Sequence, residues 1–106
     1  MREINVKEVQ DIILETQEDK TIQDMYIHKS PCAENSLGAV FFAISGTPPK
    51  GYAMYLPEEG DKAGILHVFD NFGLKRKILH CKIIDLGSYK DNDIWSAQAV
   101  KPQVKA

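Results

Sequence analysis

The chain has 106 residues, 43% of them hydrophobic, and its 13 basic and 15 acidic side chains give a formal net charge of −2. This length predicts a single domain over residues 1–106, and this apolar fraction excludes wholesale disorder. The slight acidic excess argues against a general nucleic-acid binder, which needs many lysine and arginine side chains on one face.

The first predicted element is a surface helix that begins after Asn5. Asn5 is a favoured N-cap residue, and Glu8, three positions later, completes the pattern of a capping box. A narrow apolar stripe at helical spacing follows, formed by Val9, Ile12 and Ile13. The polar stretch 17–20 ends this helix, and residues 21–26 are expected to add a further helical turn.

The stretch from Ser30 to Gly46 has two interpretations. Its apolar middle, residues 39–44, fits a fully buried strand. The ends favour a helix, because Ser30 is a good N-cap, Pro31 suits the first helical position, and Gly46 stands where helices commonly end. We therefore predict a helix with Cys32 in its first turn, and the strand remains the alternative.

After Pro49 the sequence predicts strands, over residues 51–56, 65–70, 75–85 and 94–100. The segment Asn71-Phe72-Gly73 predicts a hairpin between the second and the third, with Gly73 in the left-handed conformation. Such a turn puts His67 opposite Lys77 and leaves His67 and His80 a strand apart, offset along the ladder. N-terminal helices packed on an antiparallel sheet of about four to five strands make an α+β fold.

Cys32 is the candidate nucleophile. At the N-terminus of the predicted helix, free N–H groups and the helix dipole lower the pKa of a thiol. A nucleophilic cysteine also needs a histidine that takes its proton and a third group that orients the histidine. His67 and His80 lie downstream on predicted strands. The alternative is a half-buried thiol with two histidines on a sheet face, and Cys32 and Cys81 are in either case expected to be free thiols.

Three segments after Cys32 occur in an order that is typical of one enzyme family. They are Pro49-Lys50-Gly51-Tyr52-Ala53-Met54-Tyr55-Leu56, His67-Val68-Phe69 and Lys77-Ile78-Leu79-His80-Cys81. They resemble the strands of NlpC-type papain-like cysteine peptidases, in which a Pro-Gly turn, a His-Val pair and a second histidine follow the cysteine. The resemblance implies a papain-like core with Cys32 as nucleophile, His67 as general base and His80 as orienting group. It also implies Tyr26 as the candidate that assists the oxyanion hole.

The cysteines and histidines do not have the spacing of a metal site. Structural zinc ligands usually come in pairs two to four residues apart, and these side chains do not. We therefore expect neither a metal nor a cofactor. The basic run Lys75-Arg76-Lys77 is interpreted as a solvated strand edge rather than a phosphate contact.

The resemblance implies a small cysteine hydrolase that acts on an amide bond of a peptide substrate such as a cell-wall peptide. The alternative is a non-catalytic α+β binding protein, such as a toxin-neutralising immunity protein or a phage-encoded inhibitor. Such a protein would dock on a protein partner through acidic loops. The candidate docking residues are Glu58, Glu59, Asp61, Asp91 and Asp93.

The sequence contains neither a membrane span nor a signal-peptide pattern. Its longest apolar run, Ala39–Ile44, is far shorter than the roughly 18 residues that a span needs. The first residues also lack a charged stretch followed by an apolar one. We therefore expect a soluble protein with no membrane or nucleic-acid partner. It would be cytoplasmic, or exported without a cleaved signal peptide, as a delivered effector domain would be.

Overall fold

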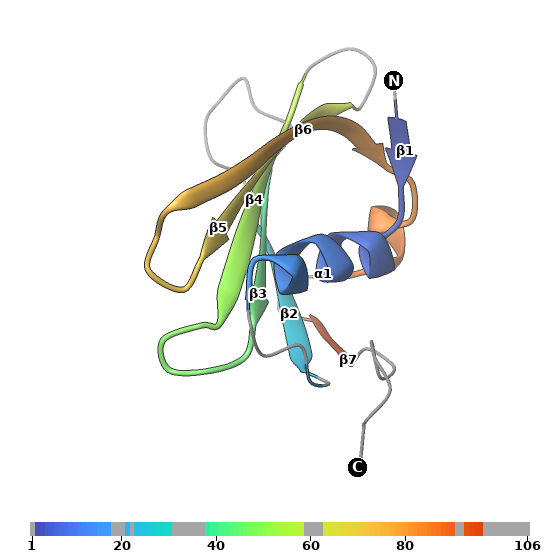
Figure 1. The fold of residues 1–106 in the computed structure, drawn as a ribbon. Helices are drawn as coiled ribbons and strands as arrows, with labels where there is room; N and C mark the ends of the chain where they lie inside the picture. The colour runs from blue at the N-terminus through green and yellow to red at the C-terminus, as the bar shows by residue number, and fades with distance from the viewer. Residues whose placement is uncertain are drawn as a thin grey trace.

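A computed structural model describes residues 2–17, 21, 23–30, 38–58, 63–90 and 93–96. In these ranges a curled sheet wraps around one α-helix (Figure 1). The strands are β1 (Arg2–Ile4), β2 (Asp24–Ser30), β3 (Ala39–Ile44), β4 (Gly51–Pro57), β5 (Gly64–Asp70), β6 (Lys75–Ile83) and β7 (Asp93–Ser96). The helix α1 spans Val6–Glu15, and the 3-10 helix η1 spans Leu86–Ser88.

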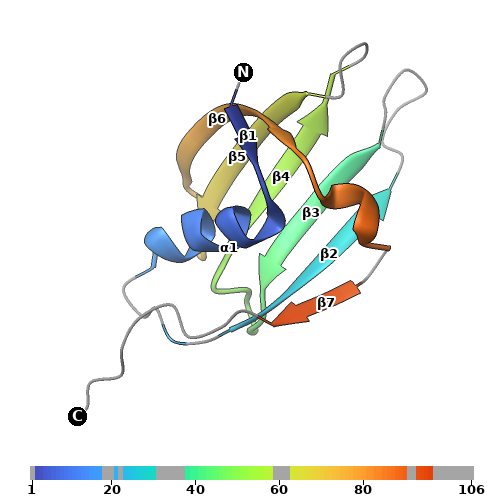
Figure 2. The same ribbon diagram turned by 90° about the vertical axis from the view of Figure 1, so that its right-hand side faces the viewer.

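The sheet is an antiparallel meander with one strand added at each side. Its order is β1-β6-β5-β4-β3-β2-β7. The strands from β2 to β6 pair in chain order, as hairpin-connected strands usually do, and β7 returns antiparallel to β2 (Figure 2). β1 pairs in parallel with the end of β6, which brings the N-terminal segment to the opposite margin from β7.

The fold is mostly β, so the predicted α+β fold with N-terminal helices, four to five strands and a papain-like core is wrong. The helix expected between Ser30 and Gly46 is wrong for the described residues, because β2 ends at Ser30 and β3 covers Ala39–Ile44. The helical turn expected over 21–26 is also wrong, since β2 begins at Asp24. β3 reads as a continuous apolar run because apolar side chains occupy both faces of the strand, and such a run also matches helical spacing.

The prediction for the first helix is confirmed. The Asn5 side chain accepts a hydrogen bond from the Glu8 N–H at 2.8 Å, and the Glu8 carboxylate accepts one from the Asn5 N–H at 3.3 Å. This reciprocal pair is the capping box, which satisfies two N–H groups that a helix start otherwise leaves free. The apolar stripe of Val9, Ile12 and Ile13 is buried.

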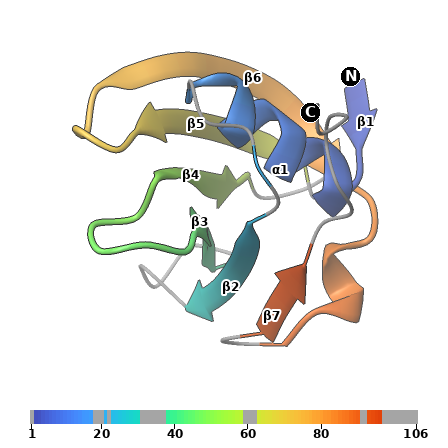
Figure 3. The same ribbon diagram turned by 60° about the horizontal axis from the view of Figure 1, so that its bottom comes forward.

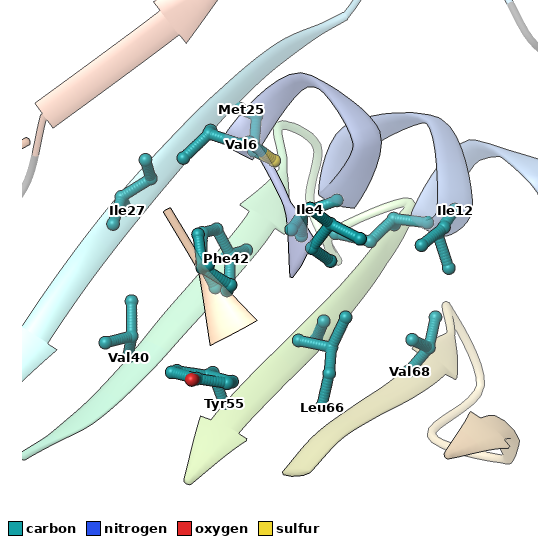
Figure 4. Packing of buried hydrophobic residues seen from close by; sticks show 14 of the residues in the cluster. Ile4, Val6, Ile12, Met25, Ile27, Val40, Phe42, Tyr55, Leu66 and Val68 are labelled. Carbon is teal, nitrogen blue, oxygen red and sulfur yellow. The ribbon is translucent and has the colours of Figure 1, made fainter. Parts of the chain in front are cut away.

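The core lies between α1 and the concave face of the sheet. Figure 4 shows Ile4, Val6 and Ile12 facing Phe42, Leu66 and Val68 across this space. Gly51 on β4 allows the close approach of the helix. A Cβ at Gly51 would lie 2.9 Å from Ile13 Cγ2 and 2.4 Å from the side-chain nitrogen of Gln17. The absence of a side chain at this position therefore lets α1 pack directly against β4.

The predicted hairpin between β5 and β6 is confirmed. The Asp70 N–H donates to the Leu74 carbonyl at 3.0 Å, and Gly73 has a φ of +83°. The Asp70 carboxylate accepts hydrogen bonds from the N–H groups of Phe72 and Leu74 and from Arg76 Nε. Burial works to raise the pKa of Asp70, but the hydrogen bonds from Leu74, Arg76 and Phe72 and the charge of Arg76 lower it overall. One buried carboxylate thus holds the whole turn.

The predicted register beyond this turn is wrong by one residue. The pairing with β5 steps from Lys77 to Lys75, so Arg76 forms a β-bulge and has no partner in the ladder. His67 therefore lies opposite Ile78 rather than Lys77. β6 ends at Ile83 instead of continuing to residue 85.

β7 begins one residue before the expected start and is described to Ser96, and residues 97–100 of that prediction lie outside the described residues. Within the described ranges, no helix combines the length and the apolar character that crossing a membrane requires.

Candidate functional site

The convex face of the sheet, opposite α1, carries a row of aromatic rings. Strand register places Tyr26, Phe41, Tyr52 and Phe69 on this face, on β2, β3, β4 and β5 in turn. Neighbouring ring centroids are 6.3, 5.5 and 4.9 Å apart, and Tyr52 and Phe69 are stacked. Among the described residues no segment covers this face (Figures 1 and 3). We call these four rings the aromatic row.

Exposed aliphatic side chains extend the aromatic row in both directions. Ile94 on β7, opposite Tyr26, is 66% exposed, and Ile78 on β6 is 53% exposed. Met54 and Leu56 on β4 are also exposed, and the register places both on the same face. Single exposed apolar residues are ordinary, but a contiguous apolar patch of this kind usually marks an interaction site.

Two of the predicted catalytic residues, His67 and His80, share this convex face with Tyr26, the candidate for the oxyanion hole. His80 lies opposite Ile65, two residues before His67 along β5, so the two histidines are diagonal neighbours. This confirms the expected offset along the ladder, although the register differs. Such neighbours have Cα atoms about 7–8 Å apart. Tyr26 lies on β2, three strand spacings or about 14 Å from His67, and its ring contacts Phe41. The structure therefore does not bring the predicted oxyanion residue to the histidines.

Cys32 lies outside the described residues, so its role as nucleophile stays a prediction. The segment that leads to it does not match the expectation, because Ser30 is the last residue of β2 rather than a helix N-cap. The strand that leads to Cys32 is separated from His80 on β6 by β3, β4 and β5. The long helix whose dipole was expected to lower the Cys32 pKa is absent over 39–44.

Cys81 is a buried free thiol in the core, on the concave face. Burial raises the pKa of the Cys81 thiol, and the charge of Arg2 opposes this effect only partly. The Tyr55 hydroxyl donates a hydrogen bond to the Cys81 carbonyl at 3.3 Å. This buried bond links β4 to β6 within the core. A buried thiol with a raised pKa is a poor nucleophile.

The acidic residues expected to dock a partner are only partly described. Glu58 is exposed directly after β4, and Asp93 begins β7, where its carboxylate accepts a hydrogen bond from the Lys90 N–H. Strands β3 and β2 separate these two positions. Glu59, Asp61 and Asp91 lie outside the described residues. Within the described ranges, no three histidine, cysteine or carboxylate side chains gather as a metal site.

The pKa of His67 is lowered, first by its partial burial in the convex face and then by the positive charge of Lys75. We expect Lys75→Gln to raise the His67 pKa towards the ordinary value of about 6.5. Titration of the imidazole ¹³C–¹H signals by NMR measures both values, with Lys90→Gln as the control. An unchanged His67 pKa in Lys75→Gln would contradict the proposed charge effect.

The lowered pKa of His67 also makes the free energy of unfolding depend on pH. The folded protein holds the His67 proton less tightly than the unfolded chain, whose histidine titrates near 6.5. The free energy of unfolding therefore falls as pH drops from about 6.5 through the folded-state pKa, and this loss should be smaller in Lys75→Gln.

Comparison with known proteins identifies no relative of the chain. No protein-family model matches it, and no curated protein or solved structure is significantly similar to it.

Proposed function

We propose that the protein is a non-catalytic binding protein that holds a protein partner against the convex face of its sheet. The observation that carries this proposal is the aromatic row with its exposed aliphatic neighbours, on a face that no described segment covers. Aromatic residues and methionine are enriched in the cores of protein interfaces, where a few of them supply most of the binding free energy.

The charges around the aromatic row indicate the chemistry of the partner. Lys75 lies opposite Phe69, and the register also places Lys82 and His80 of β6 on the convex face. The acidic side chains that the register assigns to this face, Asp24 and Glu3, lie at the first residue of β2 and on the margin strand β1. An apolar protein surface bordered by carboxylates therefore complements this face.

The ring geometry favours a protein over single-stranded nucleic acid. Base stacking needs an open ring face, whereas these rings are half-buried and lie against one another. Tyr52 and Phe69, with centroids 4.9 Å apart and an interplanar angle of 14°, leave no room for a base between them. A partner that packs over the edges of such rings is typical of protein interfaces.

The cysteine hydrolase that the family resemblance implies stays a prediction that depends on Cys32. Binding through the convex face needs no contribution from that thiol. The variant Cys32→Ala therefore separates the two functions, because it abolishes hydrolysis and leaves partner binding unchanged.

Photocrosslinking from the convex face tests the proposal. A photoreactive amino acid at Met54 should form an adduct in the native cell that the same group at Ile84 does not form. Ile84 is a matched control, because it is 56% exposed and follows β6 at the sheet margin, where its N–H donates to the Ile4 carbonyl. The protein crosslinked at Met54 is identified by mass spectrometry and purified for titration.

Calorimetric titration of the purified partner then decides the proposal. We expect Met54→Glu to weaken binding by about tenfold or more, because it places a charge in the centre of an apolar interface. Ile84→Glu and Cys32→Ala should bind as the unmodified protein does. Equal affinity of Met54→Glu and Ile84→Glu, or the loss of binding in Cys32→Ala, would contradict the proposal.

A further inference from the structure

The outer side of β6 is largely an open strand edge. β5 pairs with β6 from Lys75 to Cys81, apart from the bulge at Arg76, but β1 covers only Cys81, Lys82 and Ile83 on the other side. Among the described strands, none pairs with the outer side of Lys75–His80, and Figure 3 shows β6 running well past β1. We call Lys75–His80 the free edge. Alternate backbone N–H and C=O groups of such an edge point outwards and are available to another strand.

The two halves of the free edge differ in character. The first half carries the three exposed cations Lys75, Arg76 and Lys77 and the bulge at Arg76. Arg76 is already paired with the Asp70 carboxylate, which leaves Lys75 and Lys77 to act on their surroundings. The second half has regular pairing with β5 and includes the exposed Ile78. The free edge thus combines positive charge with a regular, partly apolar stretch.

The charges of Lys75 and Lys77 determine which kind of strand can pair with the free edge. Lysine residues and bulges on an edge oppose pairing with a second copy of the same edge, because self-pairing brings like charges together. The same lysines attract an extended segment that carries carboxylates. Lys75 points to the convex face and Lys77 to the concave face, so such a segment would meet a cation on either side. Ile78, on the convex face, would meet an apolar side chain of the same segment.

We propose that the free edge binds an acidic, extended segment of the partner protein as an added strand of the sheet. This inference rests on the proposed function, because it names the part of the partner that β6 would hold while the rest packs on the convex face. Main-chain hydrogen bonds to the edge supply affinity in this mode, and the side chains supply specificity. The added strand would lie in line with β1 and extend the sheet beside residues 75–80.

A synthetic peptide tests the proposal without the natural partner. The probe is a fluorescein-labelled peptide of about eight alternating glutamate and valine residues, long enough to span the free edge. Fluorescence anisotropy should show binding to the unmodified protein, and amide hydrogen exchange of residues 78–80 should slow when the peptide is added. A peptide of the same sequence with two consecutive N-methylated residues in its middle should not bind, because it lacks a donor on each of its edges.

Two charge reversals provide the matched protein variants. We expect Lys77→Glu to weaken binding of the peptide by about tenfold, whereas Lys90→Glu, with the same change in net charge, should alter it by about twofold at most. Lys90 is an exposed lysine between η1 and β7, at the opposite margin of the sheet. Circular dichroism establishes that both variants are folded.

Three results would overturn the proposal. Equal binding of the N-methylated peptide would show that attraction between charges alone explains the binding, without an added strand. Absence of binding would remove the edge as a strand acceptor. Tighter binding of a thymidine oligonucleotide, weakened by Lys77→Glu, would identify nucleic acid as the ligand instead.

The titrations with the natural partner distinguish this inference from the proposed function. A partner that is weakened by Met54→Glu but not by Lys77→Glu would contradict the added strand and support binding to the convex face. If Met54→Glu left the affinity for the partner unchanged, the proposed function would be contradicted, even if the peptide bound to the free edge.

Discussion

Replacing Phe42 with alanine is expected to lower the free energy of unfolding by about 3–5 kcal/mol. Phe42 is fully buried at the centre of β3, and its cross-strand neighbours on the concave face are Ile27 and Ala53. Truncation removes the transfer free energy of the ring and leaves a cavity beneath α1 that the rigid sheet cannot close. Small domains have only about 5–15 kcal/mol of stability in total, so urea unfolding should show a large shift of the midpoint.

Phe72→Ala is the matched control for this change. Phe72 lies at the tip of the β5–β6 turn and is 80% exposed, so its truncation should alter stability by no more than about 0.5 kcal/mol. A similar loss in the two variants would show that Phe42 is not the centre of the core. If Phe42→Ala lowered the free energy of unfolding only slightly, the placement of β3 between β2 and β4 would be contradicted.

Replacing Gly64 with alanine is expected to cost about 1–3 kcal/mol, because the added methyl group has no space. A Cβ at Gly64 would lie 2.5 Å from the Leu56 carbonyl oxygen and 2.8 Å from Pro57 Cα. Both are backbone atoms of the neighbouring strand, so no side-chain rotation relieves the overlap. The strands β4 and β5 would have to move apart where Gly64 pairs with Pro57.

Gly87→Ala is the control for the Gly64 prediction. A Cβ at Gly87, in η1, meets nothing within 4 Å, so alanine should be tolerated there with a change of about 0.5 kcal/mol or less. Chemical denaturation of both variants measures the difference. Equal stability of Gly64→Ala and the unmodified protein would mean that β4 and β5 do not pack as closely as described.

The features that the sequence determined by itself are local. The capping box of Asn5 and Glu8 and the turn with Gly73 each depend on side chains and backbone groups within a few residues of one another. Their predictions are therefore confirmed. The strands β4, β5 and β6 were also expected close to their observed positions, because turn residues bound each of them.

Local sequence signals could not determine the secondary structure of the segment that forms β3. Residues 39–44 satisfy the helical spacing and the pattern of a buried strand equally well. Only their pairing with β2 on one side and β4 on the other makes the strand the stable choice. The error in the register of β6 has a similar origin, since a single bulge at Arg76 moves every later residue by one partner.

Part of the candidate site could be predicted from the sequence, and part of it became visible only in the folded sheet. The histidines His67 and His80 were recognisable from the sequence, and their offset on adjacent strands followed from the hairpin between them. The aromatic row was missed, although Tyr52, Met54 and Leu56 alternate on β4 in a way that indicates a second apolar face. Its rings come from four strands, and only the register of the folded sheet brings them into contact. The tertiary structure decided the site because side chains that are neighbours across strands are distant in the sequence.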